Sequence, residues 1–366
     1  MQKKIVIAWL ATGMLALAAC AAPTQEAAES VNDTSETAVP AGVDLAAVKE
    51  YALDNAQQMK TGSAALAATA QSYYDLMAGY GFDYTAAWNA DAATLTDLVS
   101  QLKDNWLEAS THYELDEGIV AGVPSLSSYD VWIDAGPSAE EDPAEAFEWT
   151  LELPDGRTLE SPGNFFHSLL EPTIWVTNED FTGLPVDLDS DGAILLGEGL
   201  PEANILLAAS TGLDQATGEM IASIEAWEPS MEDAFTALVV MIPTMNEYFE
   251  QWKLSSFVAG QDAEDTAFIG TSRLFDINGI LNGLDYTYQS ISPVVQSAEP
   301  ELHGQIEAGF TDLRGYVSDL YSQEQNGTVF SAEQVDLFGT EAQGKATSLA
   351  GQVSQAAALL DIETAE

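Results

Sequence analysis

The sequence predicts an all-α protein of two packed helical-bundle lobes, with a small β-hairpin inserted among the helices. Long segments carry apolar residues at helical spacing, and only the segment from 123 to 180 combines prolines with an alternating stretch. Apolar residues make up 46% of the 366 residues, which is enough for a sizeable core. We place the helical domain at residues 44 to 362, with lobes of about 44 to 180 and 205 to 362.

The first 20 residues are predicted to be a lipoprotein signal peptide. Lys3 and Lys4 form a basic start, an apolar run follows, and the sequence LAAC before and at Cys20 resembles a bacterial lipobox. The run is shorter than the ~20 residues of a comfortable membrane helix, although an uncleaved helical anchor is the alternative. We therefore expect lipidation at Cys20 and an exported protein tethered to a bacterial membrane, in the periplasm or at the cell surface.

Residues 21 to 43 are small, polar and acidic, so they are predicted to be a flexible tether. The first helix is expected to begin at an N-cap, Asp44, and to end at Gly79 or Gly81. The second is expected from Asp91 to about residue 122, with an apolar face formed by Leu95, Leu98, Leu102, Trp106 and Leu107.

The stretch EWTLELPDGRTLE alternates around a Pro-Asp-Gly turn at residues 154 to 156, which predicts the hairpin. Beyond it, a helix is expected to carry Pro201 in its first turn. Further helices are predicted at 216–227, 231–253, 265–295, 300–323 and 331–361.

Residues 187 to 198, DLDSDGAILLGE, have the ligand spacing of a calcium loop. The expected ligands are the side chains of Asp187, Asp189, Asp191 and Glu198 and the carbonyl of Ala193. A calcium sensor has a helix on each side of its loop, whereas glycines and prolines stand there in this sequence. We therefore expect a structural Ca²⁺ that rigidifies a long connection. The alternative is an acidic turn that binds nothing.

The formal net charge is −49, from 10 Lys and Arg against 59 Asp and Glu. Such a surface repels nucleic acid and anionic membranes, so no nucleic-acid partner is expected. It would attract cations or keep the protein soluble in a salty habitat.

Several catalytic and metal motifs are absent from the sequence: the His-Glu-x-x-His pair, the Gly-x-Ser-x-Gly elbow and the phosphate-binding loop with Lys. Two histidines have acidic residues at helical spacing. His112 lies between Glu108 and Asp116, and His167 precedes Glu171 by four residues. Imidazole with carboxylate suits iron, zinc or copper, whereas the alternative for either motif is a surface ion pair.

The order of segments resembles the imelysin-like family, specifically the EfeM/EfeO-type lipoproteins of bacterial iron uptake. HYELDEGIVAG is similar to that family's Tyr-Glu-x-x-Glu-Pro helix, at Tyr113, Glu114 and Glu117. GNFFHSLLEPTIW is similar to its Gly-x-His-x-x-Glu signature, and SRLFDINGILNGLDYTYQSISPVV, with Asp276 and Asn282, to its second-lobe helix. PELHGQIEAGFTDLRGYV resembles the helix after that, and the likeness spans about residues 44 to 360.

The sequence departs from the family pattern in three places. His167 and Glu171 are four apart instead of three, and no His precedes Asp276, where Arg273 stands instead. The cupredoxin domain of some relatives is missing as well. A weakened or altered metal site is therefore an open alternative.

The resemblance implies two helical lobes with a metal or ligand site in the cleft between them. By that likeness, Fe or Zn ligands are expected at His167, Glu171, Glu114, Glu117 and Asp276. An iron permease or another uptake component would be the partner. Two alternatives remain. One is a metallopeptidase, although no convincing three-ligand set supports hydrolysis and the question of enzyme activity stays open. The other is a calcium-stabilised lipoprotein that binds surface polysaccharide or protein.

Overall fold

The computed structural model describes residues 42 to 263 and 267 to 365. The predicted signal peptide, with Cys20, and almost all of the predicted tether lie outside the described residues. The all-α prediction is confirmed, because helices dominate the described chain and its two β-sheets are short pairs of strands. None of the described helices combines the length and the apolar character needed to cross a membrane.

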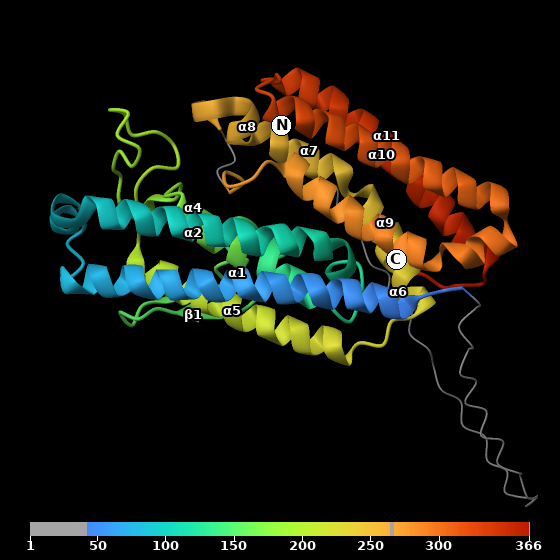
Figure 1. Cartoon of the computed structure of the whole chain (residues 1–366), viewed down its shortest axis with the longest axis horizontal. Coiled ribbons are helices and arrows are strands. Elements are labelled where there is room, and N and C mark those ends of the chain that lie inside the picture. The colour runs from blue at the N-terminus through green and yellow to red at the C-terminus, as the bar shows by residue number, and fades with distance from the viewer. Residues whose placement is uncertain (1–41, 264–266, 366) are drawn as a thin grey trace, which may run out of the picture. The chain divides into compact units, whose positions relative to one another are not determined.

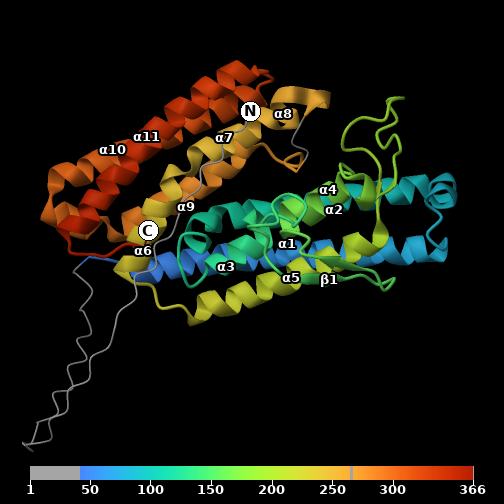
Figure 2. The same ribbon diagram turned by 180° about the vertical axis from the view of Figure 1, so that it is seen from behind.

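Three long helices form the first layer: α1 (Leu45–Gly79), α2 (Tyr84–Val120) and α5 (Ala203–Ala226). Helix α1 packs against both α2 and α5 (Figures 1 and 2). Asp44 caps α1 as predicted, since its side chain accepts a hydrogen bond from the backbone N–H of Ala47 at 3.0 Å. Helix α2 begins earlier than expected, at a cap on Asp83, and continues through a kink at Asp91.

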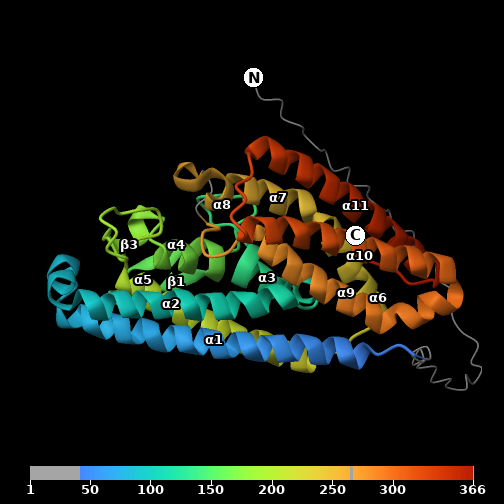
Figure 3. The same cartoon turned by 45° about the horizontal axis from the view of Figure 1, so that its top comes forward.

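The segment between α2 and α5 is irregular and carries much of the chemistry. It contains the short helices α3 (Ser127–Asp130) and α4 (Glu171–Ile174), a 3-10 turn at Glu179–Phe181, and two π-helical turns at Val131–Ala135 and Phe165–Leu170. Figure 3 shows α3 and α4 beside α2. The hairpin is confirmed: β1 (Thr150–Glu152) pairs antiparallel with β2 (Thr158–Glu160), and Gly156 adopts the positive φ that the turn needs.

A second strand pair, β3 (Thr182–Leu184) with β4 (Leu200–Pro201), encloses the Asp-rich loop. The prediction for Pro201 was wrong, because Pro201 pairs with Thr182 and α5 begins after it, capped by Glu202. The separate helix expected at 216–227 was wrong as well, because α5 continues through it to Ala226.

The remaining helices form the second layer. They are α6 (Met231–Met241), α7 (Met245–Leu254), α8 (Ser256–Ala259), α9 (Arg273–Ala298), α10 (Pro300–Gln325) and α11 (Ala332–Leu359). The single helix predicted at 231–253 was wrong, because a 3-10 turn at Ile242–Thr244, which contains Pro243, separates α6 from α7.

Buried apolar side chains form two clusters, one mainly in each layer. The first includes Trp106, Tyr113 and Met220, and the second Phe249, Tyr288 and Phe310. Helix α5 and Ala237 of α6 belong to the first cluster, whereas most of the buried apolar residues from Ala234 onward belong to the second. The layers meet where α2 packs against α9.

Candidate metal centre

Helix α2 carries two buried glutamates on its face toward α9. Glu114 and Glu117 are three residues apart and therefore share a face of the helix. Their exposed fractions are 0% and 3%. Neither carboxylate oxygen of Glu114 has a hydrogen-bond partner among the described residues, and neither does Oε2 of Glu117. Unsatisfied buried carboxylates are costly, so these oxygens are suited to bind a cation.

The two π-helical turns supply the next two side chains, Asp134 and His167. A π-turn inserts an extra residue into a helix, re-aims the side chains that follow, and is frequent at functional sites. Asn164 holds the second turn in place, since its side chain accepts hydrogen bonds from the backbone N–H groups of His167 at 2.6 Å and Ser168 at 3.1 Å.

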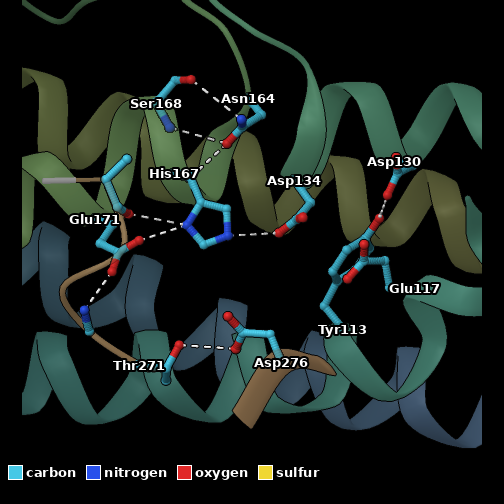
Figure 4. A network of polar contacts seen from close by, with 12 residues as sticks. Tyr113, Glu117, Asp130, Asp134, Asn164, His167, Ser168, Glu171, Thr271 and Asp276 are labelled. Carbon is cyan, nitrogen blue, oxygen red and sulfur yellow. Dashed lines mark hydrogen bonds and ion pairs between the residues drawn. The ribbon is translucent and has the colours of Figure 1, made fainter. Parts of the chain in front are cut away.

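His167 is buried, with 5% of its surface exposed, and a carboxylate lies on each side of its ring (Figure 4). Its Nδ1 lies 2.6 Å from Oε2 of Glu171, and its Nε2 lies 3.1 Å from Oδ1 of Asp134. Burial alone would lower the pKa of His167, but Asp134 and Glu171 together raise it to about 10.

Glu171 has both oxygens engaged. Its Oε1 accepts hydrogen bonds from the backbone N–H groups of Ile269 at 2.7 Å and Gly270 at 2.5 Å, while Oε2 faces His167. A carboxylate behind a histidine is the usual partner that fixes the ring orientation in metal sites. Glu171, which we expected as a ligand, therefore has the geometry of a group that positions His167.

Asp276, at the start of α9, is paired with a buried cation. Arg273 Nη1 lies 2.8 Å from its Oδ2, and the hydroxyl of Thr271 donates to its Oδ1 at 3.1 Å. The guanidinium also lies over the rings of Tyr248 and Phe268. The positive charge of Arg273, which departs from the family pattern, thus neutralises Asp276. Asp276 is therefore less available as a ligand.

Two tyrosines orient further carboxylates. The hydroxyl of Tyr248 donates to Oε1 of Glu117 at 2.6 Å, and that of Tyr113 donates to Oδ1 of Asp130 at 2.7 Å. Both tyrosines are buried, so the hydrogen bonds are shielded from water.

The cluster carries an excess of negative charge. We call it the acidic cluster; its buried carboxylates are Glu114, Glu117, Asp130, Asp134, Glu171 and Asp276. The buried side chains that can oppose them among the described residues are His167 and Arg273. Because isolated buried charges are very costly, the cluster must take up protons or a cation.

The raised pKa values of these carboxyls reflect the cost of burying their negative charges. Burial, reinforced by Asp276, raises the pKa of Glu114 well above its usual range. Burial and then Asp134 raise the pKa of Glu117 to about 7. Burial, followed by Glu117, likewise raises the pKa of Asp130 well above normal. Without a cation, several of these carboxyls therefore hold protons near neutral pH.

The ligand atoms are close enough to share a cation. One oxygen each of Glu114 and Asp134 and one nitrogen of His167 all lie within 4.8 Å of one another. Oxygens of Glu117, Asp130 and Asp134 satisfy the same limit. Glu117, Asp130, Asp134 and His167 line a cavity of about 600 Å³, and Glu114 lines a second cavity of about 590 Å³, so open space borders the cluster on both sides.

Of the five ligands expected from the sequence, His167, Glu114 and Glu117 belong to the two buried groups. Glu171 lies beside His167, and Asp276 is paired with Arg273; neither belongs to these groups. Sequence reasoning missed Asp130 and Asp134, although their four-residue spacing in the apolar stretch YDVWID was a usable signal. His112 is different, because its Nε2 lies 3.6 Å from the exposed Glu108 and its Nδ1 lies 3.4 Å from Asn55. It belongs to neither of the buried ligand groups among the described residues.

The Asp-rich loop forms a second group of oxygens at the surface. Oxygens of Asp187, Asp189 and Glu198 lie within 4.8 Å of one another. Backbone N–H groups fix the loop: Ser190 and Gly192 donate to Asp187 at 2.7 and 2.9 Å. Asp191 Oδ1 accepts a hydrogen bond from Ala193, and Gly192 has a positive φ, as the predicted sharp turn requires.

No model of a known protein family matches this chain, and a search of curated proteins finds no match.

Proposed function

We propose that this protein binds a transition-metal cation in the acidic cluster and serves as the membrane-tethered binding component of a metal-uptake system. The observation that carries the proposal is the buried set of Glu114, Asp134 and His167, whose ligand atoms lie within 4.8 Å of one another. A site of carboxylate and imidazole suits Fe²⁺ or Zn²⁺. The choice of iron, the lipid anchor at Cys20 and the extracytoplasmic location rest on the resemblance to EfeM/EfeO-type lipoproteins and on the predicted signal peptide.

Metal titration of the purified protein tests this proposal. We expect calorimetry under anaerobic conditions to detect Fe²⁺ or Zn²⁺ binding, and His167→Ala to weaken it at least tenfold. Asp116→Asn is the matched control, because Asp116 is a buried carboxylate of α2 outside both buried ligand groups. Absence of binding to either metal, or equal binding by His167→Ala, would refute the proposal.

We also propose that the Asp-rich loop holds a structural Ca²⁺. The close approach of Asp187, Asp189 and Glu198 supports it, and the β3–β4 pair leaves no entering or leaving helix of the sensor type. Calcium at 100 times its Kd should stabilise the fold by about 2.7 kcal/mol. We expect Asp189→Ala to lose this gain, measured as thermal stability with and without Ca²⁺, whereas Asp180→Asn, an exposed acid outside the loop, should retain it.

A further inference from the structure

The two buried groups of ligand atoms share one residue, Asp134. We propose that the acidic cluster holds two cations, bridged by the carboxylate of Asp134. This inference rests on the proposed metal-binding function and adds its stoichiometry and the difference between its two sites.

The first site would use Nε2 of His167, Glu114 and Asp134. Glu171 and the backbone hold the other ring nitrogen, so Nε2 is the nitrogen that faces the cluster. Both oxygens of Glu114 have no hydrogen-bond partner among the described residues, which leaves them free to bind a cation. Mixed nitrogen and oxygen ligands favour Fe²⁺ or Zn²⁺ at this position.

The second site would use oxygens of Glu117, Asp130 and Asp134. Tyr248 and Tyr113 each hold one oxygen of the first two side chains. Oxygen Oε2 of Glu117 is buried and has no hydrogen-bond partner in the described part of the chain. A site made only of carboxylate oxygens prefers harder cations such as Mn²⁺ or Mg²⁺.

Asp134 is placed to serve both sites. Figure 4 shows it between His167 on one side and Glu117 and Asp130 on the other. Shared carboxylates are a common means of holding two metal ions a few ångströms apart. Two divalent cations would also neutralise most of the charge: six carboxylates are opposed here by Arg273, with the proton of His167 displaced by metal. One divalent cation would leave three negative charges buried, and two would leave one.

Manganese is the probe we would use, because two Mn²⁺ ions joined by a carboxylate give an exchange-coupled electron paramagnetic resonance spectrum. The full chain would carry Asp189→Ala throughout, so that the surface loop contributes no ion. In this background we expect two Mn²⁺ per chain with a coupled spectrum. Asp130→Asn should leave one uncoupled ion, and Asp116→Asn, the buried control on α2, should leave two.

The outcomes separate this inference from the proposed function. One Mn²⁺ per chain, or two ions without coupling, would overturn the two-cation inference while metal binding itself stands. No bound Mn²⁺, together with no Fe²⁺ or Zn²⁺, would refute both. The stoichiometry and spectrum of the Asp189→Ala background decide the matter even if Asp130→Asn fails to fold, which circular dichroism would reveal.

Discussion

His167 is held between two carboxylates, and their different surroundings give them different roles. Glu171 is anchored by two backbone N–H groups, whereas Oδ1 of Asp134 has no hydrogen bond of good geometry beyond its ion-pair contact with the ring. A carboxylate fixed by backbone can orient an imidazole, while one with an open oxygen can move toward a metal. The hydrogen-bond partners of each carboxylate thus decide whether it orients the imidazole or can bind a metal.

Replacement of Glu171 tests its positioning role. We expect Glu171→Gln to lower metal affinity by about 10- to 100-fold, because the neutral amide no longer supports the basicity and orientation of His167. Metal titration measures the effect, and Glu171→Asp, which keeps the charge, should recover part of it. If Glu171→Gln lowers only the thermal stability of the metal-free protein and leaves affinity unchanged, Glu171 has no role beyond the fold.

Contacts between single residues could be predicted from the sequence where the two residues lie a few positions apart. The four-residue separation of His167 and Glu171 predicted their contact, and the structure gives it at 2.6 Å. The four-residue spacing of Asp130 and Asp134 was the same kind of signal, but it was not used. The spacing alone does not give the π-turn that follows the short helix, and this turn sets how the two carboxylates face the cluster.

The acidic cluster forms where helix α9 crosses helix α2. Gly279 of α9 lies directly against Glu114, and a Cβ added to Gly279 would stand 2.9 Å from the Cβ of Glu114 and 3.1 Å from its carbonyl carbon. The close approach of the two helices therefore requires glycine at this position. It also fixes how deeply the glutamate is buried.

Gly279→Ala should separate the helices and displace Glu114. We expect a loss of about 1–3 kcal/mol in the free energy of unfolding, measured by chemical denaturation, together with weaker metal binding. Gly304→Ala is the control, since Gly304 is an exposed residue of α10 with no atom within 4 Å of an added Cβ. That change should stabilise the protein by up to ~1 kcal/mol through helix propensity. Equal effects of the two changes would contradict the packing argument.

The presence of helices was largely predictable, whereas the boundaries of α5, α6 and α7 were not. The apolar periodicity of α1, α10 and α11 identified each helix and came close to its ends. The break between α6 and α7 was missed, although Pro243 marks it. The cap of α5 on Glu202 was missed because Pro201 also suits the first turn of a helix, and only its pairing with β3 decides otherwise.

For the whole molecule, the acidic cluster sets the dependence of stability on pH. The pKa of Glu117 rises to about 7 on folding, from an ordinary value of about 4.3, so the folded state binds the proton more tightly. Its contribution to stability is complete below pH ~4.3 and is lost as pH rises through 7. The raised pKa of His167, about 10, acts in the same direction at higher pH.

We therefore expect the metal-free protein to become less stable between pH 6 and 9, where exposed carboxylates have already ionised. Glu117 alone accounts for roughly 1 kcal/mol of this loss, because most of the effect of its raised pKa falls between pH ~4.3 and 6. Denaturation at several pH values measures the slope, which should be smaller in Glu117→Gln. Saturation with metal should reverse the trend, because protons compete with the cation at low pH. A metal-free stability that is constant over this range would contradict the argument.

The order of residues in the cluster has a consequence for how the protein is made. All five proposed ligands precede residue 168, whereas Tyr248, Ile269, Gly270 and Arg273, which orient or neutralise cluster side chains, follow residue 247. A chain that emerges from its N-terminus thus presents every ligand of the two proposed sites long before these four groups from the second half of the molecule. During synthesis the early segment would therefore hold cations poorly. If the acidic cluster binds a metal as we propose, loading would await the start of α9, where Arg273 lies.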